Sequence, residues 1–179
     1  MNIRIPKFSL VVLIGAAGCG KSTFARKHFR ATEILSSDFF RSLITDDEND
    51  ISASGDAFEL LYDVAEKRLK RGKLTVSDAT NVKREQRKQL LQIAERYDCP
   101  SVAIVFNFPE EICQERNQVR TYRTVPVHAI SNQMKNLRHS LQTLKDEGFK
   151  GVYILSSPTE TDQVTVERDE GGTPGTHRT

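Results

Sequence analysis

Residues 9–23 read SLVVLIGAAGCGKST, an apolar run that breaks into glycines and ends in Lys-Ser-Thr. Within this stretch, residues 15–22 fit the pattern G-x-x-x-x-G-K-[ST] without mismatch. Glycines let the backbone turn tightly and point successive N–H groups at a polyphosphate, and a helix that follows adds the positive end of its dipole. We therefore predict a nucleotide-binding loop between a strand and a helix, formed by Gly15, Ala16, Ala17, Gly18, Cys19, Gly20, Lys21, Ser22 and Thr23.

Three side chains of this loop have expected roles of their own. Lys21 is expected to reach the β- and γ-phosphates of ATP or another nucleoside triphosphate, and the Ser22 hydroxyl to bind Mg²⁺. Cys19 lies where helix-terminal N–H groups can lower the pKa of a thiol, which would suit a redox role. The simpler interpretation, which we favour from the sequence, is that Cys19 is a small residue that fits the loop.

Composition limits the function classes. The chain has 179 residues, enough for one α/β domain and too few for two of ordinary size. No segment approaches the roughly 18–20 apolar residues of a membrane span, and the first residues do not resemble a secretory signal, so we expect a cytoplasmic protein with no membrane partner. The three cysteines have no metal-ligand spacing and indicate reduced thiols. The net charge of +2 argues neither for nor against a nucleic-acid partner.

Apolar runs alternate with helix-like segments along the chain. We predict strands at residues 10–14, 33–37, 74–77, 102–107 and 152–155. Helices are predicted from Lys21, over 58–69 with Gly72 as the stop, over 83–97, from Pro109 through Arg116, and over 127–147. This alternation is typical of an α/β fold of the P-loop NTPase type, with about five parallel strands and helices on both faces.

The predicted domain covers residues 1–168. The remaining residues, 169–179, read DEGGTPGTHRT and contain no side chain able to anchor a core. We expect them to form a flexible tail or the start of a linker to a further domain.

The class of P-loop protein follows from motifs that the chain has and lacks. No N-K-x-D sequence, which would read guanine, occurs late in the chain, and no long apolar strand ends in Asp-Glu as in mechanical ATPases. The remaining plan is that of compact kinases, in which the acceptor lies beside the P-loop and an arginine-bearing lid closes over the phosphates. Because parallel sheets bind ligands at the carboxyl ends of their strands, residues 37–41 and 78–81 become candidates beside the P-loop.

The second predicted strand ends in SSDFFR, residues 36–41. Asp38 would take the proton of an acceptor hydroxyl, and Arg41, three residues later on the same side of a helical turn, would hold the transferring phosphate. The alternative is that Asp38 only caps a helix and Arg41 is a surface charge. At the end of the third strand, Asp78 has three open roles: it could orient Arg41, reach the metal through water, or cap a turn.

Three arginines in ERNQVRTYR are the lid candidates. The spacing of Arg116, Arg120 and Arg123 places all three on one face of a helix. Like charges there repel unless they share an anion such as a triphosphate, and arginine favours bidentate phosphate contacts. We therefore expect Arg116 and Arg120 to bind the nucleotide and Arg123 to belong to the catalytic set, with a solvated basic face as the alternative.

With these residues assembled, the chain resembles the N-terminal 5′-OH polynucleotide kinase module of bacterial polynucleotide kinase-phosphatase, in the Pnkp RNA-repair family. The resemblance runs from residue 6 to residue 167 and includes SLVVLIG, GKSTFARKHF, SSDFFR, DDEND, GKLTVSDATN, VFNFPEEICQERN and GFKGVYILSSP. It implies transfer of the γ-phosphate of ATP, or another NTP, to a 5′-OH end of RNA or DNA. It also implies that Asp38 is the general base, that Arg41 contacts the transferring phosphate and that the three arginines form the lid.

In that family a metal-dependent phosphatase and a ligase-like adenylyltransferase module follow the kinase, and the resemblance implies such modules as covalent partners. This sequence departs from the family's pattern in two places. Ala16, Ala17 and Cys19 stand where more serine is expected, which the loop tolerates because its backbone donors do the binding. Tyr122 replaces a small or acidic residue, which leaves the detailed lid contacts open.

The acceptor assignment rests mainly on the resemblance. Basic groups at residues 67–73 (KRLKRGK) and 83–88 (KREQRK) could follow a strand's phosphates, but a solvated helix face is the simpler interpretation. Two other functions stay open: a kinase of a sugar, nucleoside or nucleotide-sugar, as in the zeta-toxin-like kinases, and a nucleotide-dependent binding module without transfer activity. Phosphate transfer that requires an added 5′-OH oligonucleotide separates the three.

Overall fold

The computed structural model describes residues 1–121 and 123–169, and at its centre is a five-stranded parallel sheet. Its strands lie in the order β3-β4-β2-β5-β6, which are Ile34–Ser36, Thr75–Asp78, Leu10–Ile14, Ser101–Phe106 and Gly151–Leu155. Each predicted strand is found to within one residue at either end, so the α/β class is confirmed. The P-loop strand β2 is central and pairs with both β4 and β5.

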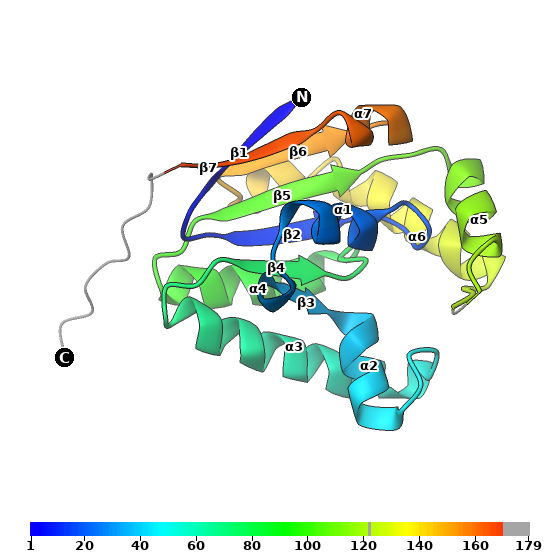
Figure 1. Cartoon of the computed structure of the whole chain (residues 1–179), viewed down its shortest axis with the longest axis horizontal. Helices are drawn as coiled ribbons and strands as arrows, with labels where there is room; N and C mark the ends of the chain where they lie inside the picture. The colour runs from blue at the N-terminus through cyan, green and yellow to red at the C-terminus, as the bar shows by residue number, and fades with distance from the viewer. Residues whose placement is uncertain (122, 170–179) are drawn as a thin grey trace.

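Helices cover both faces of this sheet (Figure 1). In chain order they are α1 (Lys21–His28), α2 (Ser37–Thr45), α3 (Ser54–Leu69), α4 (Arg84–Arg96), α5 (Glu110–Gln118), α6 (Val127–Ser140) and α7 (Pro158–Asp162). Short 3-10 turns, η1 to η3, occupy Ala31–Glu33, Ile51–Ala53 and Leu144–Asp146. None of the helices within residues 1–121 and 123–169 is long and apolar enough to cross a membrane.

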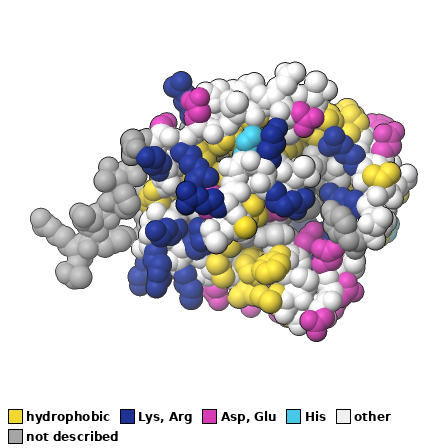
Figure 2. All heavy atoms as spheres, viewed as in Figure 1, with side chains coloured by type: hydrophobic (Ala, Val, Ile, Leu, Met, Phe, Trp, Pro, Cys, Tyr) yellow, Lys and Arg dark blue, Asp and Glu magenta, His cyan; other side chains and the backbone are white. Residues whose placement is uncertain are grey.

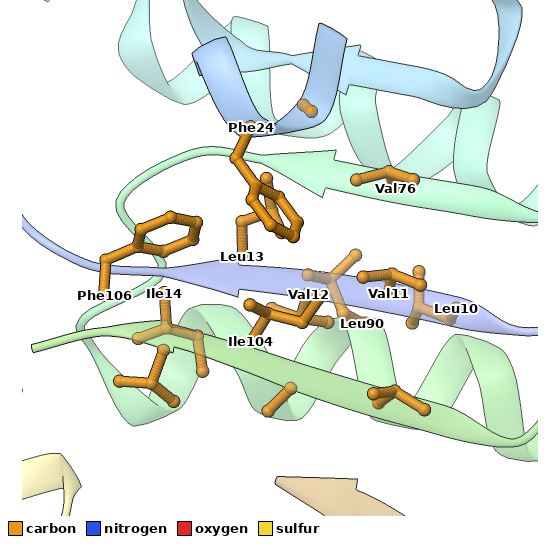
Figure 3. Packing of buried hydrophobic residues seen from close by; sticks show 14 of the residues in the cluster. Leu10, Val11, Val12, Leu13, Ile14, Phe24, Val76, Leu90, Ile104 and Phe106 are labelled. Atoms are coloured by element: carbon orange, nitrogen blue, oxygen red, sulfur yellow. The ribbon is translucent and has the colours of Figure 1, made fainter. Parts of the chain in front are cut away.

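The core is built on strands whose residues are buried throughout. All of β2 and all of β5 are buried, so neither strand alternates apolar and polar residues, as expected for a sheet covered on both faces. Figure 3 shows the side chains of β2 packed with Phe24 of α1, Val76 of β4, Leu90 of α4 and Ile104 of β5. Each such side chain contributes about 1.5–3 kcal/mol when fully buried, so the P-loop starts from a rigid strand.

Helix α6 ends at Ser140, whereas the sequence predicts a helix as far as residue 147, and the turn η3 follows it. The chain turns there so that Glu147 can point inward. Its carboxylate accepts hydrogen bonds of 2.7 and 2.6 Å from the fully buried guanidinium of Arg87. Arg87 also donates to the carbonyl of Asn81 at 2.8 Å, so this ion pair supports the loop that follows β4.

A two-stranded parallel sheet, absent from the sequence prediction, joins β1 (Asn2–Pro6) to β7 (Thr165–Asp169). The Arg168 guanidinium of β7 donates two hydrogen bonds, of 2.9 and 2.8 Å, to the carboxylate of Glu33. The ribbon is therefore fastened to the turn before β3. The last residue of β7, Asp169, is also the first residue of the predicted tail. Residues 170–179 lie outside the described part of the chain.

Candidate active site

The P-loop connects β2 to α1, and two of its glycines lie in the left-handed region of backbone conformation. Gly18 has a φ of +86° and Gly20 a φ of +93°, values that other residues disfavour. Space is also closed at Gly18, where a Cβ would lie 2.0 Å from the carbonyl oxygen of Cys113 in α5. Gly20 is the N-cap residue of α1, so the first N–H groups of that helix have no helical acceptor and can bind an anion.

Lys21, the first residue of α1, is only 8% exposed. Its Nζ donates to the carbonyl of Ala16 at 2.8 Å and lies 3.6 Å from Sγ of Cys19, so the ammonium turns back over the loop. The N–H of Gly15 donates to the carbonyl of Thr80 at 2.9 Å, which ties the start of the loop to the segment after β4. The loop thus holds a largely desolvated cation, which favours an anionic ligand.

Asp78, the last residue of β4, lies close to the start of α1. Burial raises the pKa of Asp78, while the charge of Lys21 and a hydrogen bond with Ser22 act in the opposite direction. A hydroxyl beside a carboxylate is a hard oxygen donor set of the kind that Mg²⁺ takes. Ser22 could therefore hold the ion and Asp78 could assist, which favours the metal-side role among those left open for Asp78.

Further ligands for such an ion would have to come from the nucleotide. Among residues 1–121 and 123–169, no group of three or more His, Cys, Asp or Glu side chains could hold a metal. Phosphate oxygens are the usual remaining ligands of Mg²⁺ at P-loops. The side chains present thus fit an ion that arrives together with a nucleotide.

Asp38 lies in the first turn of α2, and both of its carboxylate oxygens are ion-paired. Oδ1 pairs with Nη2 of Arg41, and Oδ2 pairs with Nη1 of Arg123. The cap of α2 is instead the hydroxyl of Ser36, which accepts a hydrogen bond from the N–H of Phe39 at 3.4 Å. Arg41 is buried, so neither the capping role nor the surface charge offered as alternatives describes this pair. The Asp38 carboxylate thus lies between two guanidinium groups.

The two arginines at Asp38 are themselves partly desolvated. Burial lowers the pKa of Arg41 and of Arg123, and the charge of Glu48 opposes the effect at Arg41. Nε of Arg41 also donates to the carbonyl of Glu48 at 2.9 Å, so the segment DDEND holds this side chain in place. Arginine keeps its proton in proteins, so both guanidinium groups can bind a phosphate as cations.

The three lid arginines do not share one helical face, which corrects the sequence prediction. α5 ends two residues after Arg116, so Arg120 and Arg123 lie in the segment between α5 and α6. The helix ends because the buried Asn117 reaches across: its Nδ2 donates to the carbonyl of Val125 at 2.8 Å, and its Oδ1 accepts from the N–H of Val125 at 3.0 Å. This pair of hydrogen bonds closes a loop, residues 117–125, which we call the arginine loop. Tyr122 lies outside the described residues.

Two cavities meet at the P-loop, with volumes of about 380 and 280 Å³. Gly18 and Arg120 border both of them. The predicted residues Ala17, Lys21, Ser22, Asp38, Arg41 and Arg123 line the first cavity. The predicted residues Cys19, Gly20, Thr23 and Arg116 line the second. Gly15 and Ala16 are buried beneath the loop and line neither.

Two polar side chains that shape the site were not singled out from the sequence. Gln133 of α6 accepts a hydrogen bond from the P-loop N–H of Ala17 at 2.8 Å, across 116 residues of chain. Asn117 closes the arginine loop. An amide side chain in a helix usually faces solvent, and nothing local distinguishes these two from the exposed ones.

The basic group at residues 67–73 lies away from the first cavity. Figure 2 shows Lys and Arg side chains gathered over the C-terminal end of α3, at the lower left of the view. Ser54, at the opposite end of the same helix, lines the first cavity. Phe58 of this helix also lines the cavity, so Lys67, where the group begins, lies about 14 Å further along α3.

A family model described as an AAA domain matches residues 10–144. No curated protein sequence matches the chain. Among solved structures, a chain of the Pnkp1/Rnl/Hen1 RNA repair complex aligns with a TM-score of 0.63 and 24% identity, over 78% of this chain and 47% of that one. This chain therefore spans about half the length of that relative.

Two further structures of the same fold align over nearly their whole length. A gluconokinase from Sinorhizobium meliloti 1021 has a TM-score of 0.53 and 16% identity, with 88% of this chain and 91% of that chain covered. Kti12 from Chaetomium thermophilum, solved in complex with ADP-AlF3, has a TM-score of 0.57 and 18% identity, with 86% and 94% covered. The fold is thus that of P-loop kinase-type domains.

Proposed function

The chain belongs to the AAA domain family, and we propose that it is a 5′-hydroxyl polynucleotide kinase, which transfers the γ-phosphate of ATP, or another NTP, to the 5′-OH end of RNA or DNA. The observation that carries the proposal is the position of Asp38, which shares one cavity with Lys21 and Ser22. A carboxylate beside a phosphate cradle can accept the proton of an acceptor hydroxyl, and the two guanidinium groups next to it can bind the transferring phosphate.

In the proposed reaction the nucleotide binds at the P-loop. The N–H groups of the P-loop and Lys21 hold its β- and γ-phosphates, and Arg116 and Arg120 bind it from the lid side. Mg²⁺ bound at Ser22 would neutralise charge on the phosphate oxygens. Arg120 borders both cavities, which supports a contact with the phosphates.

The acceptor hydroxyl then binds in the first cavity. Asp38 accepts its proton while the hydroxyl oxygen attacks the γ-phosphorus in line with the departing β–γ bridging oxygen. Arg41 and Arg123, already paired with Asp38, bind oxygens of the transferring phosphate and stabilise the charge that spreads over them.

A polynucleotide acceptor is supported by the ordered motifs that resemble the Pnkp RNA-repair family and by the fold shared with the Pnkp1 complex chain. Phosphatase and ligase-like modules are proposed as covalent partners of the kinase, with residues 1–168 as the kinase domain. The three free thiols suit a reducing compartment, which supports a cytoplasmic location.

A second candidate is a kinase of a sugar or another small molecule. It is supported by the gluconokinase, which aligns over 91% of its own length. The same P-loop, Asp38 and arginines would serve that reaction, so only the acceptor separates the two candidates. A binding module without transfer is the third.

A competition for label distinguishes the candidates. The protein is mixed with γ-labelled ATP, Mg²⁺, a 5′-OH RNA oligonucleotide, the matching DNA and a panel of sugars and nucleosides. Label on an oligonucleotide end is the expected result, and the same oligonucleotides with a 5′-phosphate are the matched control. Label on a small molecule would favour the second candidate, and tight nucleotide binding without label on any acceptor would favour the third.

An Asp38→Asn variant tests the base within the same assay. It keeps the size of the side chain and removes the proton acceptor, so transfer should be lost while nucleotide binding remains. Transfer at the wild-type rate would remove Asp38 from the mechanism.

A further inference from the structure

The side chain of Gln133 is held at the P-loop by one of its two polar atoms. Its Oε1 accepts the hydrogen bond of 2.8 Å from the N–H of Ala17. A backbone N–H can only donate, so the atom that faces it must be the oxygen of the amide, and the nitrogen points elsewhere. Nε2 makes no hydrogen bond within residues 1–121 and 123–169, and it is not enclosed by protein. The amide therefore offers its N–H donors in a fixed direction.

These donors belong to the first cavity. Gln133 lines it together with Ala17 and Lys21. The carboxylate of Asp38, on the same cavity, is already paired with two guanidinium groups. The nitrogen of an amide can bind only a hydrogen-bond acceptor, and the Lys21 ammonium beside the same cavity favours an anionic one. A phosphate oxygen of a bound nucleotide meets both requirements.

The two cavities indicate which phosphate this is. Cys19 and Gly20 of the P-loop line the second cavity and not the first. Ala17 and Gln133 line the first cavity and not the second, as does Asp38, the proposed base. In the proposed reaction the terminal phosphate lies between the rest of the nucleotide and the acceptor, so it occupies the side of the P-loop that faces Asp38. Gln133 lies on that side.

We propose that Gln133 binds the γ-phosphate of the nucleotide, with Nε2 as the donor and the N–H of Ala17 as the group that orients the amide. The inference rests on the proposed function only as far as the nucleotide is concerned, because no property of the acceptor enters it. The cations of the site supply charge, whereas a neutral amide supplies direction. Its hydrogen bond favours one orientation of the γ-phosphate, as in-line attack by a hydroxyl requires.

A purely structural role for the same hydrogen bond would be to tie α6 to the P-loop. Helix α6 begins at Val127, just after the arginine loop closes at Val125, so the tie would also fix the end of that loop. The two roles use different atoms of the amide, because the tie needs only the oxygen and the γ-phosphate needs the nitrogen. A Gln133→Glu substitution keeps an acceptor for the N–H of Ala17 and removes the donor, and it therefore separates the two roles.

Nucleotide affinity tests the proposal, with ADP and the non-hydrolysable ATP analogue AMP-PNP, which keeps the γ-phosphate, as the two ligands. In calorimetric titrations with Mg²⁺, we expect Gln133→Glu to weaken binding of AMP-PNP by ~10-fold or more and to weaken binding of ADP much less. Asn132→Asp is the matched control, because it makes the same change from amide to carboxylate at an exposed neighbour in α6, and it should leave both affinities unchanged. Equal losses for the two nucleotides, or no loss for either, would overturn the proposal.

A neutral variant separates loss of the donor from the added negative charge. Gln133→Met keeps the length of the side chain, and it too should weaken AMP-PNP more than ADP. If the ratio of the two affinities in Gln133→Met equals that of the wild type, the donor has no role and the proposal is wrong. Neither ligand needs an acceptor, so a kinase that acts on a small molecule would give the same result. If the wild type binds neither nucleotide, the inference fails together with the P-loop assignment.

Discussion

Removal of the Asn117 side chain should release the arginine loop. In the Asn117→Ala variant, the buried N–H and carbonyl of Val125 both lose their partner. Each buried group left unpaired costs about 1–3 kcal/mol, so the closed loop is destabilised by about 2–6 kcal/mol. A change of ~1.4 kcal/mol shifts an equilibrium tenfold, so even the low end of this range raises the open population more than ~10-fold.

Limited proteolysis measures this opening directly, because trypsin cleaves after Arg120 and Arg123. We expect cleavage within the loop to be at least ~10-fold faster in Asn117→Ala, and turnover to fall because two arginines leave the site. Gln118→Ala is the matched control, since Gln118 is an exposed neighbour and should leave both rates unchanged. Equal cleavage of Asn117→Ala and wild type would refute the role given to Asn117.

Other substitutions probe the cradle, the lid and the buried ion pair. Lys21→Ala should weaken binding of a fluorescent ATP analogue at least ~10-fold, because the loop loses its cation; unchanged affinity would contradict the P-loop assignment. Arg120→Ala should raise KM for ATP or lower kcat by at least ~10-fold in steady-state kinetics. If both constants equal those of the wild type, Arg120 is a solvated surface residue with no role in binding the nucleotide. Arg87→Met should lower the free energy of unfolding in urea by about 3–5 kcal/mol, because Glu147 is left buried without its partner. Burial raises the pKa of Glu147, but its ion pair with Arg87 outweighs this and holds the pKa below its ordinary value of 4.5. The stabilisation from the ionised Glu147 is therefore present above pH 4.5 and is lost as the pH falls below it. The Glu147→Gln variant should lack this loss when its unfolding is followed in an acid titration.

The sequence was sufficient where the signal is local. The P-loop pattern, the apolar run of β2 and the alternation of strands and helices each depend on residues close together in the chain. The three-residue spacing of Asp38 and Arg41 likewise placed them on one side of α2, where they form an ion pair.

The rest depends on contacts between distant residues. The spacing of the arginines fits one helix, yet two buried hydrogen bonds between Asn117 and Val125 override that preference. Arg123 instead lies beside Asp38 and pairs with it. The pairing of β1 with β7 joins the two ends of the described chain, and the close approach of Gly18 to the carbonyl of Cys113 joins the P-loop to α5. No pattern within a short window of sequence carries such information.

The β1–β7 ribbon determines how the protein could be held for experiments on single molecules. In Figure 1 the ribbon ends at the left of the view, whereas α2 and α5, which carry Asp38 and Arg116, lie at the right. A surface anchor fused beyond β7 would therefore attach on the side away from both cavities. Molecules immobilised in this way would present the edge that carries the two cavities to the solution.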